Sequence, residues 1–360
     1  MIEMKNNTEK LLMDHCLKYP LLKSEDIFKF LFQSALGCEH LVSDEGAALD
    51  YLVREYQGVC KSCDALVESL DGKYSRVHLS ILNDTLDIKT FAKLFCLSAK
   101  KEENGIKELA KKLEIAGALI DDGVLPIDID KCEFENALEK WAQAGYPAVR
   151  HSEIFRAQYH PAYRVIDNGF VKLLPLFSRI DKLLKTDTRN VVVAIEGGSA
   201  SGKSTLASLL AKVYDCNLFH ADDYFLRPEQ RTPQRLAQVG GNLDRERFDD
   251  EIISKLKKNE PITYRPFDCS TQTLDDPVTV NPKKLTVVEG VYSMHPEFDR
   301  YFDLSLFLDI SPSYQKERIL KRNPPFLAKR FFEEWIPLEN VYFAKTNIKE
   351  RCDLVILADE

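Results

Sequence analysis

The sequence predicts two parts, an all-helical domain over residues 1–170 and an α/β domain with a mainly parallel sheet over residues 188–360. In the first part, apolar residues recur at helical spacing, and no segment alternates strongly between apolar and polar residues. In the second part, short β-branched runs alternate with helical stretches, which is typical of a parallel sheet covered by helices. A glycine-rich segment joins the first run to the helix after it.

The helices of the first part are predicted from their starts and their apolar faces. Ser24, which two acidic residues follow, begins one helix, and Ser43 opens a second stretch that runs to about Gly58. Asp87 is expected to cap a third helix. Helical stretches are also predicted over residues 106–119 and 133–144, with a linker helix over residues 171–187.

Five short apolar runs are the predicted strands of the second part. Each is bounded by polar or glycine-containing segments and is separated from the next by a longer stretch. The runs are Val191–Ile195, Asn217–His220, Leu285–Val288, Leu304–Leu308 and Leu354–Leu357.

Composition limits the function classes. The net charge of −8 argues against a nucleic-acid partner and against a membrane surface. No signal-peptide pattern begins the chain, and its apolar runs fall far short of the ~20 residues that span a bilayer, so a cytoplasmic protein is expected. Most of the nine cysteines are expected to be free thiols. Cys60 and Cys63 form a CxxC pair, for which a metal or redox role is the alternative.

The glycine-rich segment GGSASGKST matches the phosphate-binding pattern G-x-x-x-x-G-K-[ST]. Its glycines let the backbone wrap a phosphate, and the helix that follows adds the positive end of its dipole. Lys203 is expected to reach the β- and γ-phosphates of ATP, and the Ser204 hydroxyl to ligate Mg²⁺. By itself the pattern fits a GTPase, a motor ATPase or a kinase. The predicted ATP-binding residues are Gly197, Gly198, Ser199, Ala200, Ser201, Gly202, Lys203, Ser204 and Thr205.

Further segments carry a family resemblance. HADDYF follows the second predicted strand, VVEGVY ends the third, and FLDISPSYQKERILKRN comes later. Together with the phosphate-binding loop, this succession resembles the uridine kinase/phosphoribulokinase family over residues 188–360. The resemblance implies a P-loop kinase fold, with a five-stranded parallel sheet and a helical lid.

The resemblance also implies roles for single residues. Asp222 matches the catalytic base that takes a proton from the acceptor hydroxyl; its alternative is a helix cap. Glu289 matches a carboxylate near Mg²⁺, with a structural ion pair as the alternative. Arg318 and Arg322 match lid arginines that, with Lys203, stabilise the transferring phosphoryl group, whereas a solvated helix face is the alternative.

The acceptor site is harder to read. The candidate acceptor residues, each with a salt bridge or another structural contact as the alternative, are Tyr224, Asp244, Arg247, Arg265 and Asp268. Cys269 and Gln272 stand where uridine kinases have an aromatic residue and a histidine, and Phe267 replaces a tyrosine. These departures leave the acceptor open.

The leading hypothesis is therefore a kinase that transfers the γ-phosphoryl group of ATP to a hydroxyl of a nucleoside-like or other small alcohol. The alternative from another class is an ATP-sensing switch whose helical domain engages a partner. Five histidines in the first part, including His78 and His151, leave open a second site, and so do Arg76 and Tyr163. The sequence also leaves open whether the chain forms a homo-oligomer.

Overall fold

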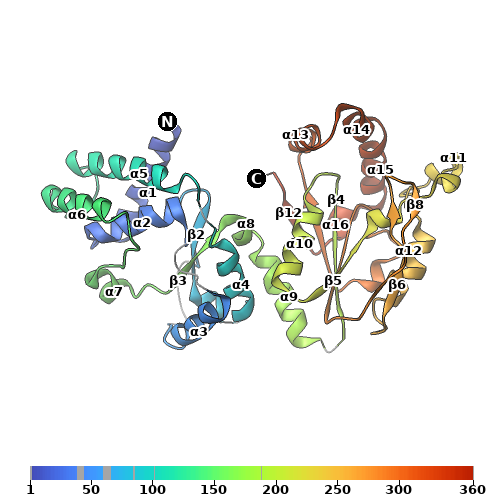
Figure 1. Ribbon diagram of the computed structural model, residues 1–360, viewed down its shortest axis with the longest axis horizontal. Coiled ribbons are helices and arrows are strands. Elements are labelled where there is room, and N and C mark those ends of the chain that lie inside the picture. The colour runs from blue at the N-terminus through green and yellow to red at the C-terminus, as the bar shows by residue number, and fades with distance from the viewer. Residues whose placement is uncertain are drawn as a thin grey trace. The chain divides into compact units, whose positions relative to one another are not determined.

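The computed structural model describes residues 2–38, 44–59, 66–83, 86–100, 102–187 and 189–359, with side chains from residue 5 onward. The chain divides into two compact units, Met1–Ser178 and Arg179–Glu360 (Figure 1). Within the described residues, no helix is long and apolar enough to cross a bilayer. The described cysteines are all free thiols, as predicted, while Cys60 and Cys63 lie outside the described residues.

The first unit is mainly helical, and its helices begin close to the predicted positions. Asp44, Asp87 and Asp130 each cap a helix by accepting a hydrogen bond from a backbone N–H of its first turn. The helices are α1 (Ile2–Lys18), α2 (Ser24–Leu36), α3 (Glu45–Tyr56), α4 (Ile88–Ser98), α5 (Gly105–Asp121), α6 (Lys131–Gln143), α7 (Glu153–Tyr159), α8 (Asn168–Val171) and α9 (Leu174–Thr186), the last of which continues into the second unit.

A three-stranded antiparallel sheet in the first unit was not predicted, so residues 1–170 are not purely helical. Its order is β1 (Val67–Ser69), β2 (Tyr74–His78) and β3 (Tyr163–Asp167). The first four residues of β2 are all buried, so this strand lacks the alternation that reveals a strand with one solvated face. Its partner β3 lies far along the chain, where no local turn signal points to the pairing.

The second unit is built on a parallel sheet of the order β12-β11-β4-β10-β5, which confirms the predicted five strands. The central strand β4 is buried along its whole length, as expected for a sheet with both faces covered. The strands are β4 (Val191–Gly197), β5 (Cys216–His220), β10 (Leu285–Glu289), β11 (Leu304–Asp309) and β12 (Leu354–Leu357).

Helices and short hairpins surround this sheet. Helix α10 packs on β4, β5 and β10, and helices α13 and α14 lie together at one end of the unit (Figure 1). The helices are α10 (Lys203–Val213), α11 (Pro233–Leu236), α12 (Arg245–Glu251), α13 (Pro312–Arg322), α14 (Pro325–Arg330), α15 (Ile336–Thr346) and α16 (Ile348–Arg351). The hairpin strands are β6 (Ile262–Tyr264) with β9 (Val278–Val280), and β7 (Phe267–Asp268) with β8 (Thr273–Leu274).

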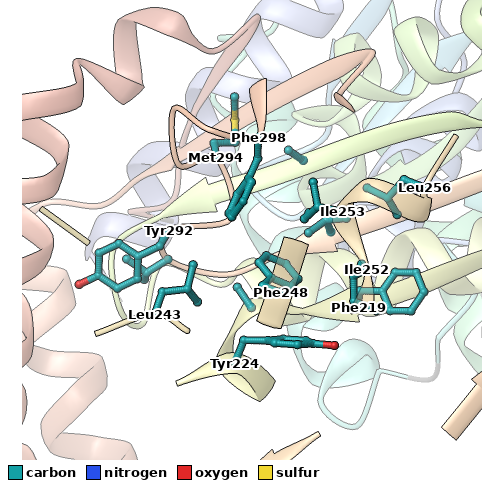
Figure 2. Packing of buried hydrophobic residues seen from close by; sticks show 14 of the residues in the cluster. Phe219, Tyr224, Leu243, Phe248, Ile252, Ile253, Leu256, Tyr292, Met294 and Phe298 are labelled. Atoms are coloured by element: carbon teal, nitrogen blue, oxygen red, sulfur yellow. The ribbon is translucent and has the colours of Figure 1, made fainter. Parts of the chain in front are cut away.

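A hydrophobic cluster supports the side of the sheet near β5 (Figure 2). Phe248 of α12 is fully buried, with its ring centroid 4.6 Å from that of Tyr224 and 5.6 Å from that of Phe298. This packing holds α12 and the segment after β5 against the core. The position of Asp222, two residues before Tyr224, is thereby tied to the sheet.

Candidate functional site

The candidate site lies at the carboxyl end of the parallel sheet. Strand β4 ends at Gly197, β10 ends at Glu289 and β5 ends at His220, and the register pairs Glu289 with His220. Ligands of open α/β sheets bind at this edge, because the loops that leave the parallel strands converge there. The phosphate-binding loop, Asp222 and Glu289 are therefore brought together by topology.

The phosphate-binding loop has the backbone conformation that its glycines permit. Gly197 has a φ of 147°, and a Cβ at this position would lie 2.5 Å from the backbone oxygen of Leu308 on the neighbouring strand. Gly202 has a φ of 100°, but a Cβ there would meet no atom within 4 Å. The first glycine is thus required for close packing as well as for its backbone angle.

Replacing these two glycines separates the two requirements. Gly197→Ala is expected to destabilise the second unit by about 3 kcal/mol or more, because the clash with Leu308 adds to the backbone strain. Gly202→Ala is expected to cost only about 1–2 kcal/mol, since it adds strain alone. Urea unfolding of both variants measures the difference, and equal losses would refute a packing role for Gly197.

Lys203 and its neighbours form the start of helix α10. The Lys203 ammonium is nearly buried and donates a hydrogen bond to the backbone oxygen of Gly198 at 2.9 Å, within the loop. Ser204 and Thr205, in contrast, are exposed. A bound phosphate would face the Lys203 charge, the N–H groups at the helix start and these two hydroxyls, which suits the predicted nucleotide-binding role.

Asp222 follows β5 in a short 3-10 turn and lines a cavity of about 960 Å³. Its side chain is reached by solvent, but protein atoms crowd around it. This desolvation, together with the nearby Glu289 carboxylate, raises the pKa of Asp222, while Lys203, His220 and Arg322 act in the opposite direction. A carboxylate whose pKa is raised is a better proton acceptor than an ordinary aspartate.

Glu289 is buried at the end of β10, where it contacts His220. Its carboxylate lies 2.5 Å from His220 Nδ1, and this hydrogen bond raises the pKa of His220. The contact with His220 is the kind of ion pair that was the structural alternative for Glu289. Glu289 also lies at the sheet edge where the Mg²⁺ site was predicted.

The oxygen donors at this edge suit Mg²⁺. Ser204 and Glu289 offer a hydroxyl and a carboxylate, the hard ligands that Mg²⁺ prefers. No group of three or more His, Cys, Asp or Glu side chains in the described residues is arranged to hold a metal alone. Magnesium usually keeps several waters and binds through one or two carboxylates and substrate phosphates, so these residues fit an ion that arrives with a nucleotide.

The two predicted lid arginines differ in surroundings. Arg322, at the end of α13, is exposed and lines the cavity together with Asp222. Arg318, one turn earlier, donates hydrogen bonds to the backbone oxygens of Ala200 at 3.2 Å and Ala358 at 2.6 Å. Arg318 therefore braces the phosphate-binding loop from outside, whereas Arg322 faces the space in which a phosphoryl group would lie.

The five predicted acceptor residues do not appear among the described residues that line this cavity. Tyr224 is buried in the core and donates a hydrogen bond to Glu251 at 2.9 Å. Arg247 stacks on the Tyr224 ring at 4.0 Å and donates to the backbone oxygen of Asp223 at 2.7 Å. Asp244 caps helix α12 and accepts from Gln230 at 2.9 Å.

The other two acceptor candidates stabilise the small hairpins. Arg265 donates to the backbone oxygens of Asp275 and Leu274, at 2.8 and 3.2 Å. Asp268 accepts from the backbone N–H and the hydroxyl of Ser270, at 2.6 and 2.7 Å. All five predicted residues thus make structural contacts.

Other residues complete the lining of the cavity. Arg231 donates to the Gln272 side-chain oxygen at 2.6 Å, and both residues face the cavity. Three apolar side chains and one amide are also part of the cavity wall; they are Phe225, Leu226, Leu236 and Asn242. In the sequence, the departures at Cys269 and Gln272 pointed to this region, and both residues line the cavity.

Two buried glutamates near the loop were also missed. Glu196 is fully buried and accepts hydrogen bonds from the backbone N–H groups of Gly197, Tyr292 and Met294. Burial raises the pKa of Glu196 to about 7, against the pull of these hydrogen bonds. Its signal was a single charged residue at the end of the apolar run VVVAIE.

The second glutamate is Glu339, on helix α15. It accepts from the backbone N–H of Ser199 at 2.9 Å and also bonds the Ser199 hydroxyl, and burial raises its pKa. No sequence pattern links Glu339 to the loop, because the two residues lie 140 positions apart.

The chain is similar to known kinases over part of its length. No model of a known protein family matches the chain. A phosphoribulokinase from Synechocystis sp. is 28% identical over 128 residues, which are 34% of this chain. The chain spans 39% of the length of that curated relative.

Two solved structures are similar over half the chain or slightly less. A possible uridine kinase from Bacillus stearothermophilus is 24% identical, with a TM-score of 0.38, and the match covers 50% of this chain and 98% of that one. A shikimate kinase from Bacteroides thetaiotaomicron is 14% identical, with a TM-score of 0.24, over 47% of this chain and 87% of that one. About a third of the chain is thus similar in sequence to a phosphoribulokinase.

Proposed function

We propose that this region, residues 188–360, is an ATP-dependent kinase that transfers the γ-phosphoryl group to a hydroxyl of a small, nucleoside-like or other alcohol acceptor. We place it after a helical domain of residues 1–170 and a linker helix of residues 171–187. The observation that carries the proposal is that Lys203, Asp222 and Arg322 line one cavity of about 960 Å³. That set combines a phosphate-binding cation, a proton acceptor and a cation on a lid.

Each residue has a role that follows from its surroundings. Lys203 binds the phosphates at the start of α10, and Asp222 accepts the proton that the acceptor hydroxyl loses. Arg322 stabilises the negative charge on the transferring phosphoryl group. Ser204 and Glu289 would hold Mg²⁺, which neutralises phosphate charge when it is bound.

We assign the part of the cavity around Arg231 and Gln272 to the acceptor. Its lining favours a compound with an apolar face and few charges. Phe225, Leu226 and Leu236 offer apolar surface, while the Asn242 amide offers hydrogen bonds. Arg231 donates a hydrogen bond to Gln272, so part of its guanidinium is used within the protein and is not free for a ligand. These residues support a neutral polyol or ribosyl compound over a phosphorylated acceptor.

An acceptor panel tests the proposed function. The full chain is incubated with ATP and Mg²⁺ and with nucleosides, sugars or vitamin-like alcohols, and both ADP and phosphorylated product are measured. We expect that at least one neutral hydroxyl compound stimulates ADP release and yields one phosphate monoester per ADP. ADP release that no acceptor stimulates would contradict the proposal.

One contact favours an ATP-sensing switch as the second candidate. Glu339 of α15 accepts a hydrogen bond from the backbone N–H of Ser199, which belongs to the phosphate-binding loop. A nucleotide that repels this carboxylate would move α15, and a partner could read that movement. Acceptor-independent nucleotide binding that alters a helical-domain interaction would favour this function.

A further inference from the structure

The first unit contains a second pocket, of about 220 Å³. It lies among residues of α1, α7 and strands β1–β3, all within Met1–Ser178. Its wall combines charged side chains with aromatic rings, chiefly Lys18, Glu68, Arg76, Phe155, Tyr159 and Tyr163. The kinase site uses none of these residues.

Arg76 is the unusual member of this wall, because it is a cation that is only 2% exposed. Its guanidinium lies over two rings, 5.2 Å from the Phe30 centroid and 4.7 Å from that of Tyr163. A planar guanidinium donates its hydrogen bonds along its edge.

Not every N–H donor along the edge of the Arg76 guanidinium has an acceptor. Nε donates to the Gln33 side-chain oxygen at 2.9 Å, and Nη1 reaches Glu68 at 3.4 Å. Nη2 of Arg76 is buried and has no hydrogen-bond partner within the described part of the chain. A buried, charged donor without an acceptor is costly, so an acceptor at the pocket would stabilise it.

A hydrogen-bond network holds the Tyr163 ring in place beside Arg76. Its hydroxyl forms hydrogen bonds with His151 Nε2 at 2.6 Å and with the Gln33 side-chain oxygen at 3.3 Å, and His151 Nδ1 forms one with Asp26 at 2.9 Å. Burial lowers the pKa of His151 to about 4, so the imidazole is neutral and can accept from the tyrosine. The network keeps this wall of the pocket rigid, so little conformational entropy is lost when a ligand binds.

The charges of the wall select the ligand. Lys18 and Arg76 are cationic and Glu68 is anionic, which leaves one positive charge in excess. Burial opposes ionisation of Glu68, but the hydrogen bond from His15 and the Arg76 charge hold the pKa of Glu68 at about 2. Glu68 is therefore charged at neutral pH, and a ligand with a single negative charge balances the pocket.

We infer that this pocket binds a small organic carboxylate with a flat or apolar body. Its carboxylate accepts from Arg76 Nη2, and its body packs on Phe155, Tyr159 and Tyr163. The pocket is too small for a nucleotide, and its single excess charge favours a monocarboxylate over a phosphate dianion. This inference is independent of the proposed kinase activity.

Titration calorimetry of the full chain tests the inference with benzoate, its neutral analogue benzamide and inorganic phosphate as probes. Benzoate is expected to bind saturably at one site, and benzamide at least about tenfold more weakly because it carries no charge. Arg76→Lys keeps the charge but removes the fork, and we expect it to weaken benzoate binding at least about tenfold. Lys18→Gln, on an exposed side chain, should weaken it a few-fold.

Arg164→Lys is the matched control. Arg164 also lies over two rings, Tyr51 and Phe95 at 5.5 Å each, and pairs with Glu55 at 2.7 Å, but it does not line the pocket. It should leave benzoate affinity unchanged. The inference is overturned if benzoate fails to bind, if benzamide binds equally well, or if phosphate binds in its place. The inference is also overturned if Arg76→Lys and Arg164→Lys weaken benzoate binding equally. If Arg76→Lys does not fold, unchanged benzoate binding by Lys18→Gln overturns it.

Discussion

Asp222→Asn is expected to lower kcat for phosphoryl transfer at least about 100-fold while ATP affinity changes little. The amide has the same shape as the carboxylate but cannot accept the proton of an acceptor hydroxyl. ATP affinity should persist because the loop, Lys203 and the start of α10 are unchanged. Single-turnover transfer and nucleotide titration of the same preparation measure the two quantities separately.

Asp223→Asn is the control for this experiment. Asp223 is adjacent in sequence but does not line the cavity among the described residues, and burial raises its pKa to about 6. Its variant should keep most of the activity. Full transfer by Asp222→Asn, or equal loss in both variants, would show that Asp222 is not the base.

The pH dependence of kcat provides an independent test of the same residue. Only the deprotonated form of Asp222 accepts a proton, so activity should fall as the pH is lowered through its pKa. Because burial raises that pKa, the fall should begin at higher pH than for an ordinary aspartate.

Arg322→Met is expected to reduce kcat on the order of 1000-fold with little change in stability. Its guanidinium faces the cavity and is exposed, so its loss removes charge stabilisation of the transferring group and only one weak structural contact among the described residues, over the Phe331 ring at 6.0 Å. Transfer rates and urea-unfolding midpoints of the variant test the two halves of this expectation.

Arg318→Met should behave in the opposite way. Removing Arg318 leaves the backbone oxygens of Ala200 and Ala358 without this donor, so the unit should lose about 1–3 kcal/mol of unfolding free energy and bind ATP more weakly. If the two variants lose the same activity and the same stability, the distinction between a lid arginine and a bracing arginine is wrong.

Local patterns explain why the donor side of the site could be predicted. The five strands are short apolar runs, and each fell where the structure has a strand. The segment from Gly197 to Thr205 needs its glycines, lysine and hydroxyls in a fixed order, so a short pattern specifies both conformation and chemistry. Asp222 and Glu289 were indicated by the family resemblance, and the parallel strands bring the positions of both to one edge of the sheet.

The acceptor side depends on contacts that no short pattern records. Arg247 and Asp244 have the residue types of a binding site, yet in the folded chain they stack on Tyr224 and cap α12. Arg318 and Arg322 are one helical turn apart and look equivalent in sequence, but only Arg322 lines the cavity. Which atoms a side chain meets depends on packing between distant elements.

The sequence alone determined the pattern of the phosphate-binding loop and the five strands, because these arise from residue order within single elements. The tertiary structure alone decided that Glu339 meets Ser199, that the first unit contains a sheet, and that the Arg76 cation lies over the rings of Phe30 and Tyr163. Those features join residues far apart in the chain. Their free energy comes from burial and hydrogen bonding across elements, which only the folded arrangement reveals.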